Sequence, residues 1–175
     1  MGRPAAVEVR TAVLNCALLA LASLLSYWLV AGVLSRLHSV SRVDDIVGGL
    51  WAAIATIFVS KDSYQHSVQA AISRVAATLV SFALCLVYLV FLPFHLWAFA
   101  LLIGLSALIP MLAGRPGDAA TAAITTAVLL ALAQLNSHHA WEQPIFRLAD
   151  TVIGAIVGVA AAWLARRLIP KLGGR

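Results

Sequence analysis

The chain has 175 residues, of which 62% are hydrophobic and 11% are charged, and its mean hydropathy is +0.97. These values exclude an ordinary water-soluble domain. The formal net charge of +5 would raise the question of nucleic acid in a soluble chain. Here the basic residues lie at the ends of apolar segments, where they set orientation and contact lipid phosphates, so we expect no binding to nucleic acid.

Long uncharged apolar segments recur along the chain. Residues 11–35 and 75–114 contain no Asp, Glu, Lys or Arg over 25 and 40 positions, respectively. About 20 apolar residues in a helix cross a hydrocarbon core of ~30 Å, so the second segment is long enough for two crossings, with Pro93 near its middle. The sequence therefore predicts six membrane-spanning helices. Their approximate limits are 10–35, 44–60, 66–92, 95–113, 117–136 and 146–169.

The breaks between these helices have the composition of turns and loops. In chain order they are residues 36–45, 61–62, 92–93, 114–118 and 136–144. The segment 114–118 has the sequence GRPGD and is a turn by its Gly and Pro residues. Because the predicted helices fill the chain, we expect a single all-α transmembrane domain over residues 1–175 and no soluble domain.

The distribution of Lys and Arg predicts the orientation in the membrane. An even number of crossings puts both termini on the same side. That side carries nine basic residues: Arg3, Arg10, Lys61, Arg74, Arg115, Arg166, Arg167, Lys171 and Arg175. The other side carries three, which are Arg36, Arg42 and Arg147. Cytoplasmic loops are enriched in Lys and Arg, so both termini are predicted to be cytoplasmic.

A weak internal repeat relates the two halves of the chain. Residues 74–78 (RVAAT) resemble residues 147–151 (RLADT) at an offset of 73, and residues 52–56 (AAIAT) resemble residues 122–126 (AAITT) at an offset of 70. Both pairs occur in the same order. With three helices in each unit, the second unit must be inverted relative to the first. Inverted repeats are typical of transporters, whose substrate path lies at the repeat interface.

Two segments carry a resemblance to a known family. One is Arg-x-x-x-Thr at residues 74–78, which follows the polar segment 61–69, and the other is RLADTVIG at residues 147–154. Over about residues 51–170 the chain resembles the fusaric acid resistance and aromatic acid exporter family. That family usually shows Arg-x-x-Gly-Thr-x-x-Gly at the first segment. Here Ala77 and Ser81 replace the glycines, so the pattern does not predict close packing of that helix.

The resemblance implies a function as well as a fold. Members of the family are proton-driven exporters of organic, often aromatic, carboxylates, and the plant malate channels resemble the same domain. Longer members carry a soluble domain or a second six-helix unit, which this sequence lacks. Self-association would be one way to supply the missing half.

Two arginines are the candidate binding residues for an organic anion. The guanidinium group forms a planar fork that matches a carboxylate, and a charge inside a membrane is costly unless it meets water, a partner or a substrate. Arg74 has Thr78 four residues later on the same helix face, and Arg147 has Thr151 at the same spacing. The alternatives are that Arg74 extends to lipid phosphates and that Arg147 pairs with Asp150.

Asp150 and Asp62 are the candidate acids for proton coupling. Asp150 lies at the start of the last predicted helix beside Arg147, and Asp62 lies beside Lys61 at the cytoplasmic edge. The alternative for both is a simple ion pair with these neighbours. No spacing of His, Cys, Asp or Glu predicts a metal site, and no cofactor motif, phosphate loop or catalytic triad is present, so we expect no enzyme activity.

Small residues on the last helix predict close helix packing. Gly154 and Gly158 are four residues apart, and this spacing lets two helices approach closely. The helix partner is either another helix of the same chain or a second copy in a homodimer, and the sequence leaves both open.

Together with the resemblance, the sequence predicts an all-α, six-span bundle of two inverted repeats in the bacterial inner membrane, and the expected function is export of small organic anions. Within transport, the alternative is an anion channel, which needs no proton-coupling acid. From another class, the alternative is a membrane scaffold or accessory subunit that transports nothing. A homodimer or higher homo-oligomer is expected in either case.

Overall fold

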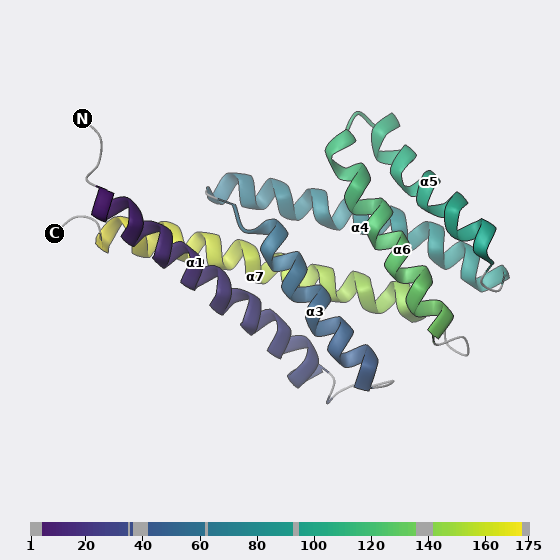
Figure 1. The fold of residues 1–175 in the computed structure, drawn as a ribbon, viewed down its shortest axis with the longest axis horizontal. Coiled ribbons are helices and arrows are strands. Elements are labelled where there is room, and N and C mark those ends of the chain that lie inside the picture. Colours follow the sequence, from purple (N-terminus) through teal and green to yellow (C-terminus); the bar gives the residue numbers. More distant parts are fainter. Residues whose placement is uncertain are drawn as a thin grey trace. The chain divides into compact units, whose positions relative to one another are not determined.

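The computed structural model describes residues 5–34, 36, 42–61, 63–92, 95–135 and 142–172. Every regular element within these residues is a helix, in agreement with the predicted all-α class (Figure 1). In chain order the elements are α1 (Ala5–Trp28), η1 (Leu29–Leu34), α3 (Arg42–Val59), α4 (Tyr64–Phe91), α5 (Leu96–Leu112), η2 (Pro116–Asp118), α6 (Ala119–Leu135) and α7 (Gln143–Leu172).

Each of the six predicted ranges overlaps one α-helix, and α1 and α7 extend beyond their predicted ranges. The helices differ in how well they fit a membrane. Four helical segments are long and apolar enough to cross it: Val9–Leu34, Tyr64–Phe91, Pro116–Gln134 and Gln143–Arg167. Helix α5 has 17 residues, which rise about 26 Å at ~1.5 Å each. Helix α3 has 18 residues, but its first turn is charged, with Arg42, Asp44 and Asp45. Six crossings therefore stay a prediction.

Contacts divide the chain into two compact units. Unit 1 comprises Met1–Ala71 and Val152–Arg175, and unit 2 comprises Ile72–Thr151. Unit 1 thus contains α1, α3, the start of α4 and most of α7, whereas unit 2 contains most of α4, α5, α6 and the start of α7. Because α4 and α7 each contribute to both units, the prediction of one membrane domain is neither supported nor opposed by this division.

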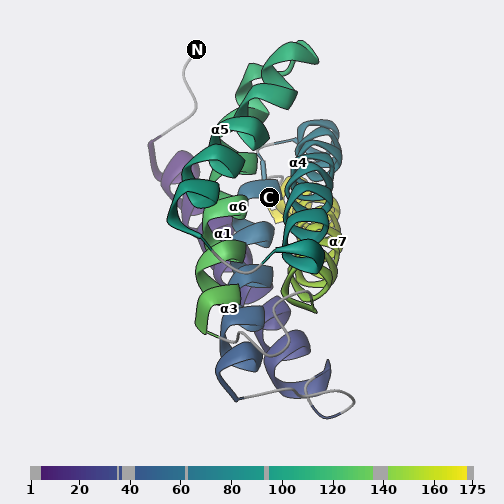
Figure 2. The ribbon, with the colours of Figure 1, turned by 90° about the vertical axis from the view of Figure 1, so that its right-hand side faces the viewer.

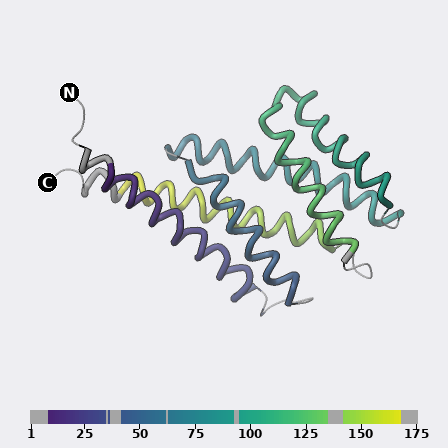
Figure 3. Tube along the Cα trace, viewed as in Figure 1, coloured from purple at the N-terminus to yellow at the C-terminus, as the bar shows by residue number. Residues whose placement is uncertain are grey.

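In unit 1, helix α3 packs against α1 and α7. Helices α1 and α3 run beside each other (Figure 3), and a Cβ atom at Gly49 would lie 2.8 Å from the Tyr27 ring. On α7, a Cβ atom at Gly154 would clash with the carbonyl oxygen of Ala52 and lie 2.7 Å from the Cβ atom of Ala55. One turn later, a Cβ atom at Gly158 would lie 3.0 Å from the carbonyl oxygen of Thr56.

The buried hydroxyl group of Thr56 links helices α1, α3 and α7 in unit 1. The Thr56 hydroxyl oxygen lies 2.9 Å from the Gly154 carbonyl oxygen, 3.0 Å from the Ala52 carbonyl oxygen and 3.0 Å from the Ser26 hydroxyl oxygen. Inside a membrane such hydroxyls hold helices together. The small-residue face of α7 therefore meets α3 of the same chain. A homodimer stays a prediction, and it would need another surface.

Replacing Gly154 by Ala is expected to destabilise the protein by about 1–3 kcal/mol, because the added methyl group overpacks the contact with the α3 backbone. Gly104 is the matched control, since it is also a helical glycine and a Cβ atom there would meet nothing within 4 Å. Gly104→Ala should leave stability unchanged or raise it by up to ~1 kcal/mol. Thermal unfolding in detergent measures both, and equal midpoints would contradict the close contact.

In unit 2, helices α5 and α6 lie side by side, as both views show (Figures 1 and 2). The apolar core between α4, α5 and α6 contains Cys85, Tyr88, Ala98, Leu102, Leu129 and Leu130. Closer to the start of α4, the Ser81 hydroxyl donates a hydrogen bond of 2.8 Å to the Ala122 carbonyl oxygen of α6. This bond joins the two helices at a position where the sequence did not predict close packing.

Candidate functional site

Besides Ser106 on α5, buried polar side chains occur on three helices of unit 2. They are Arg74, Thr78 and Ser81 on α4, Thr125 and Thr126 on α6, and Gln143, Arg147, Asp150 and Thr151 on α7. On α4 and α7 they recur three or four residues apart, so each set forms a stripe along one helix face. Polar groups in membrane-spanning helices are costly unless they have partners, which makes these stripes the candidate functional site.

Arg74 lies inside the protein. The residue is only 6% exposed. It lies on α4, which is one of the helices long and apolar enough to cross a membrane. An arginine that extends to lipid phosphates would leave the protein surface and be exposed. The burial of Arg74 therefore argues against lipid anchoring and favours a role within the protein.

The two threonines are placed alike. The Thr78 hydroxyl donates to the Arg74 carbonyl oxygen at 2.9 Å, and the Thr151 hydroxyl donates to the Arg147 carbonyl oxygen at 2.8 Å. Such bonds to the carbonyl four residues earlier are common for threonine in helices. Because each hydroxyl proton is already used, neither threonine can donate to a bound carboxylate unless its side chain rotates. The arginines are thus the stronger candidates for anion binding.

Arg147 and Asp150 form a buried ion pair. Arg147 Nη1 lies 3.0 Å from Asp150 Oδ2. The Arg147 side chain is 1% exposed and the Asp150 side chain is 6% exposed. Both residues lie on α7 within unit 2, three residues apart. This contact agrees with the alternative that Asp150 forms a simple ion pair with Arg147. Removing one partner of such a pair leaves a buried charge without compensation, which is far more costly than losing an exposed pair.

Several polar residues of this region were missed by the sequence analysis. Gln143 is 1% exposed and precedes Arg147 by one helical turn, a spacing that could have marked it as part of the same stripe. The Ser73 hydroxyl donates to the Asp118 carboxylate, which also pairs with Arg115 at 3.0 Å. This contact ties the turn before α6 to the residue preceding Arg74. Residues so far apart in sequence gave no local signal.

The candidate acid Asp62 lies outside the described residues. Its neighbour Lys61 is exposed, and the Lys61 backbone N–H donates to the Ser67 hydroxyl at 2.9 Å. The roles expected for Asp62 and Lys61 in proton coupling or pairing stay predictions.

The comparison with protein families decides the membership of the chain. A sequence profile described as fusaric acid resistance protein-like matches residues 30–161, which is more than half of the chain. The chain belongs to this family. The matched region contains both arginine segments, 74–78 and 147–154, so the resemblance predicted from them is confirmed. Searches of curated proteins and of solved structures found no match to this chain.

Membership and helix composition together identify the broad class. The fusaric acid resistance family is a family of membrane transporters rather than enzymes, and the chain contains helices long and apolar enough to cross a membrane. It is therefore a multi-pass membrane protein of the transport and resistance type.

Proposed function

We propose that this protein exports small organic carboxylates, aromatic acids among them, from the bacterial cytoplasm. The observation that carries the proposal is the burial of two arginines, Arg74 and Arg147, in membrane-spanning helices of a single compact unit. A buried guanidinium group binds a carboxylate through two parallel hydrogen bonds. Basic side chains along a path through the membrane select for anions. The family membership supports transport as the activity.

An inverted repeat is part of the proposal, and the helix contacts support it. Offsets of 73 and 70 relate Gly154 to Ser81 and Ala52 to Ala122. Gly154 meets the Ala52 carbonyl in unit 1, and Ser81 donates to the Ala122 carbonyl in unit 2. Equivalent positions thus make equivalent helix contacts. The two units also have matching helix contents. Unit 1 contains α1, α3, the start of α4 and the end of α7, and unit 2 contains α5, α6, the start of α7 and the end of α4.

The ion pair predicts the direction in which protons would move relative to the transported anion. If a substrate carboxylate takes the place of Asp150 beside Arg147, the displaced Asp150 carboxylate can be neutralised by binding a proton. Anion and proton would then bind together, as in co-transport. A proton antiporter instead needs the two to exclude each other. Export driven by inward proton flow would therefore require a second acid, for which Asp62 is the candidate.

The test is flux of labelled acids in proteoliposomes. We expect benzoate and 4-hydroxybenzoate to move faster than in protein-free vesicles, and an enclosed pH dye reports whether protons accompany them. Proton movement in the same direction supports coupling through Asp150, and the opposite direction supports antiport. Anion flux without proton movement favours a channel. Correctly inserted protein that moves no organic acid would favour the scaffold and overturn the proposal.

The predicted topology is tested with single cysteines. His95 and Gly117 are exposed in the turns before α5 and α6, and a Cβ atom at Gly117 would meet nothing within 4 Å. In a chain whose two native cysteines are replaced by Ala, Gly117→Cys should react with an impermeant thiol reagent only from the cytoplasmic side. His95→Cys should react only from the outside. Labelling of both from one side contradicts a crossing by α5.

A further inference from the structure

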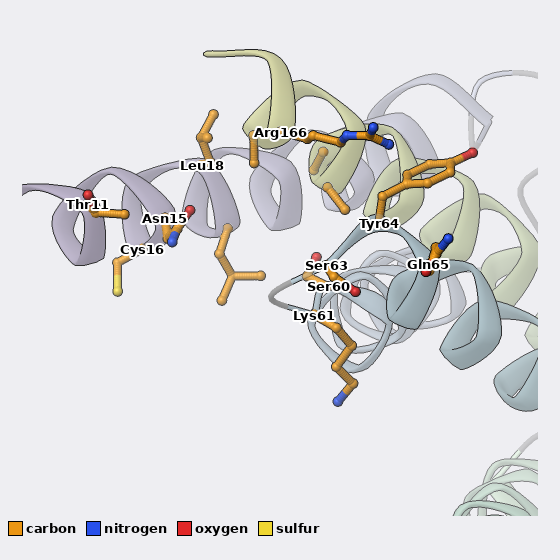
Figure 4. Close-up of a pocket in the computed structure, with 14 residues that line it drawn as sticks. Thr11, Asn15, Cys16, Leu18, Ser60, Lys61, Ser63, Tyr64, Gln65 and Arg166 are labelled. Atoms are coloured by element: carbon orange, nitrogen blue, oxygen red, sulfur yellow. The ribbon is translucent and has the colours of Figure 1, made fainter. Parts of the chain in front are cut away.

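A cavity in unit 1 is lined by none of the residues of the polar stripes in unit 2. It has a volume of about 650 Å³, within the range of small-molecule sites. Its walls come from the beginning of α1, the connection between α3 and α4, and the end of α7 (Figure 4). The predicted topology assigns all of these segments to the cytoplasmic edge of the membrane. Arg74 and Arg147 are not among its lining residues.

The lining of the cavity suits an amphipathic anion. Two basic side chains, Lys61 and Arg166, line it, and the fourteen described lining residues include no Asp or Glu. Figure 4 shows Arg166 extending from α7 towards the start of α4. Leucines and alanines of α1 and α7 supply an apolar wall. An occupant therefore needs a negative group at one end and an apolar body at the other.

A buried hydroxyl marks where the polar end would bind. The Ser60 hydroxyl oxygen is buried and has no hydrogen-bond partner among the described residues. Leaving such a group without a partner lowers stability. Because Ser60 lines the cavity, a ligand oxygen placed there would satisfy the hydroxyl. A dry apolar gap between helices would lack such a group.

We propose that this cavity is the cytoplasmic entrance site for the exported carboxylate, held by Arg166, Lys61 and Ser60 before it reaches the buried arginines. The proposal rests on the proposed function for the identity of its ligand. Positively charged clefts raise the local concentration of an anion and speed its capture. The site would thus set the affinity for acid on the cytoplasmic side only.

The native cysteines provide a test that does not depend on transport. Cys16 is exposed and lines the cavity, whereas Cys85 is buried in unit 2. In nanodiscs of phosphatidylcholine, 4-hydroxybenzoate should slow the alkylation of Cys16 by N-ethylmaleimide at least about fivefold. Arg166→Gln and Lys61→Gln should remove this protection. Arg167→Gln is the matched control, because Arg167 lies over the Trp163 ring at 4.3 Å and is absent from the lining.

The outcomes separate the site from the activity. Flux of the acid without protection of Cys16 overturns the entrance site and leaves export standing. Protection that needs Arg166 but not Arg167, in a protein without flux, supports the site and overturns export. Protection that survives Arg166→Gln, or that is lost equally in Arg167→Gln, overturns the site. Protection produced by added phosphatidylglycerol alone, with no further effect of the acid, identifies a lipid site instead.

Discussion

Replacing Arg74 by Gln is expected to reduce organic-acid flux about 30-fold or more while the protein still folds and inserts. Truncating one partner of a buried charged contact costs about 2–5 kcal/mol, and ~1.4 kcal/mol is a factor of ten. Arg74 is 6% exposed in a membrane-spanning helix, so its charge is not available for anchoring in lipid. Flux of benzoate into proteoliposomes, normalised to inserted protein, measures the effect.

Arg74→Lys is expected to retain part of the flux. Lysine keeps the positive charge but loses the planar fork that binds a carboxylate through two hydrogen bonds. Arg10→Gln is the matched control, since Arg10 is an exposed basic residue on α1 and its loss should leave flux unchanged. Wild-type flux in Arg74→Gln would remove this residue from the mechanism. If Arg10→Gln lost as much flux as Arg74→Gln, the effect would come from the overall positive charge of the protein and not from a binding role of Arg74.

The sequence predicts the helices well because apolar length and turn residues are local signals. The turn at 114–118 shows this, since Gly114 adopts a φ of +75° at the end of α5 and Pro116 begins η2. The four-residue spacing in RVAAT and RLADT likewise predicts that each arginine and threonine share a helix face. The hydroxyl bonds from Thr78 and Thr151 to the arginine carbonyls agree with it.

Contacts between distant helices could not be predicted in the same way. With Ser81 at a usual glycine position, the sequence did not predict close packing of α4. The Ser81 hydroxyl nevertheless donates a hydrogen bond to the Ala122 carbonyl oxygen of α6. The offset between Ser81 and Gly154 was visible in the sequence, yet only the backbone positions tell which carbonyl each residue meets. The bond from Ser73 to Asp118 and the cavity beside Ser60 depend equally on tertiary packing.

Asp150→Asn is expected to destabilise the protein by about 3–5 kcal/mol, because Arg147 loses the carboxylate that neutralises it in a site where the two side chains are 1% and 6% exposed. Added benzoate should restore part of this loss, since its carboxylate can take the place of Asp150 beside Arg147. A ligand that binds only the folded state stabilises it by RT ln(1 + [L]/Kd), so tighter binding at the vacated Arg147 should give a larger shift than in the wild type. Thermal unfolding with and without benzoate measures it, with chloride at equal ionic strength as the control.

The double variant Arg147→Met with Asp150→Val separates the structural role of the pair from binding. Apolar side chains of similar volume often replace a buried ion pair without loss of stability, so this variant should unfold near the wild-type temperature. It should nevertheless lose the additional stabilisation by benzoate that Asp150→Asn shows, and it should lose flux, because the guanidinium group is gone. If the double variant transports normally, the pair serves only to hold α7 in place. If benzoate stabilises Asp150→Asn no more than the wild type, the carboxylate does not bind at Arg147, and anion binding in unit 2 must rest on Arg74.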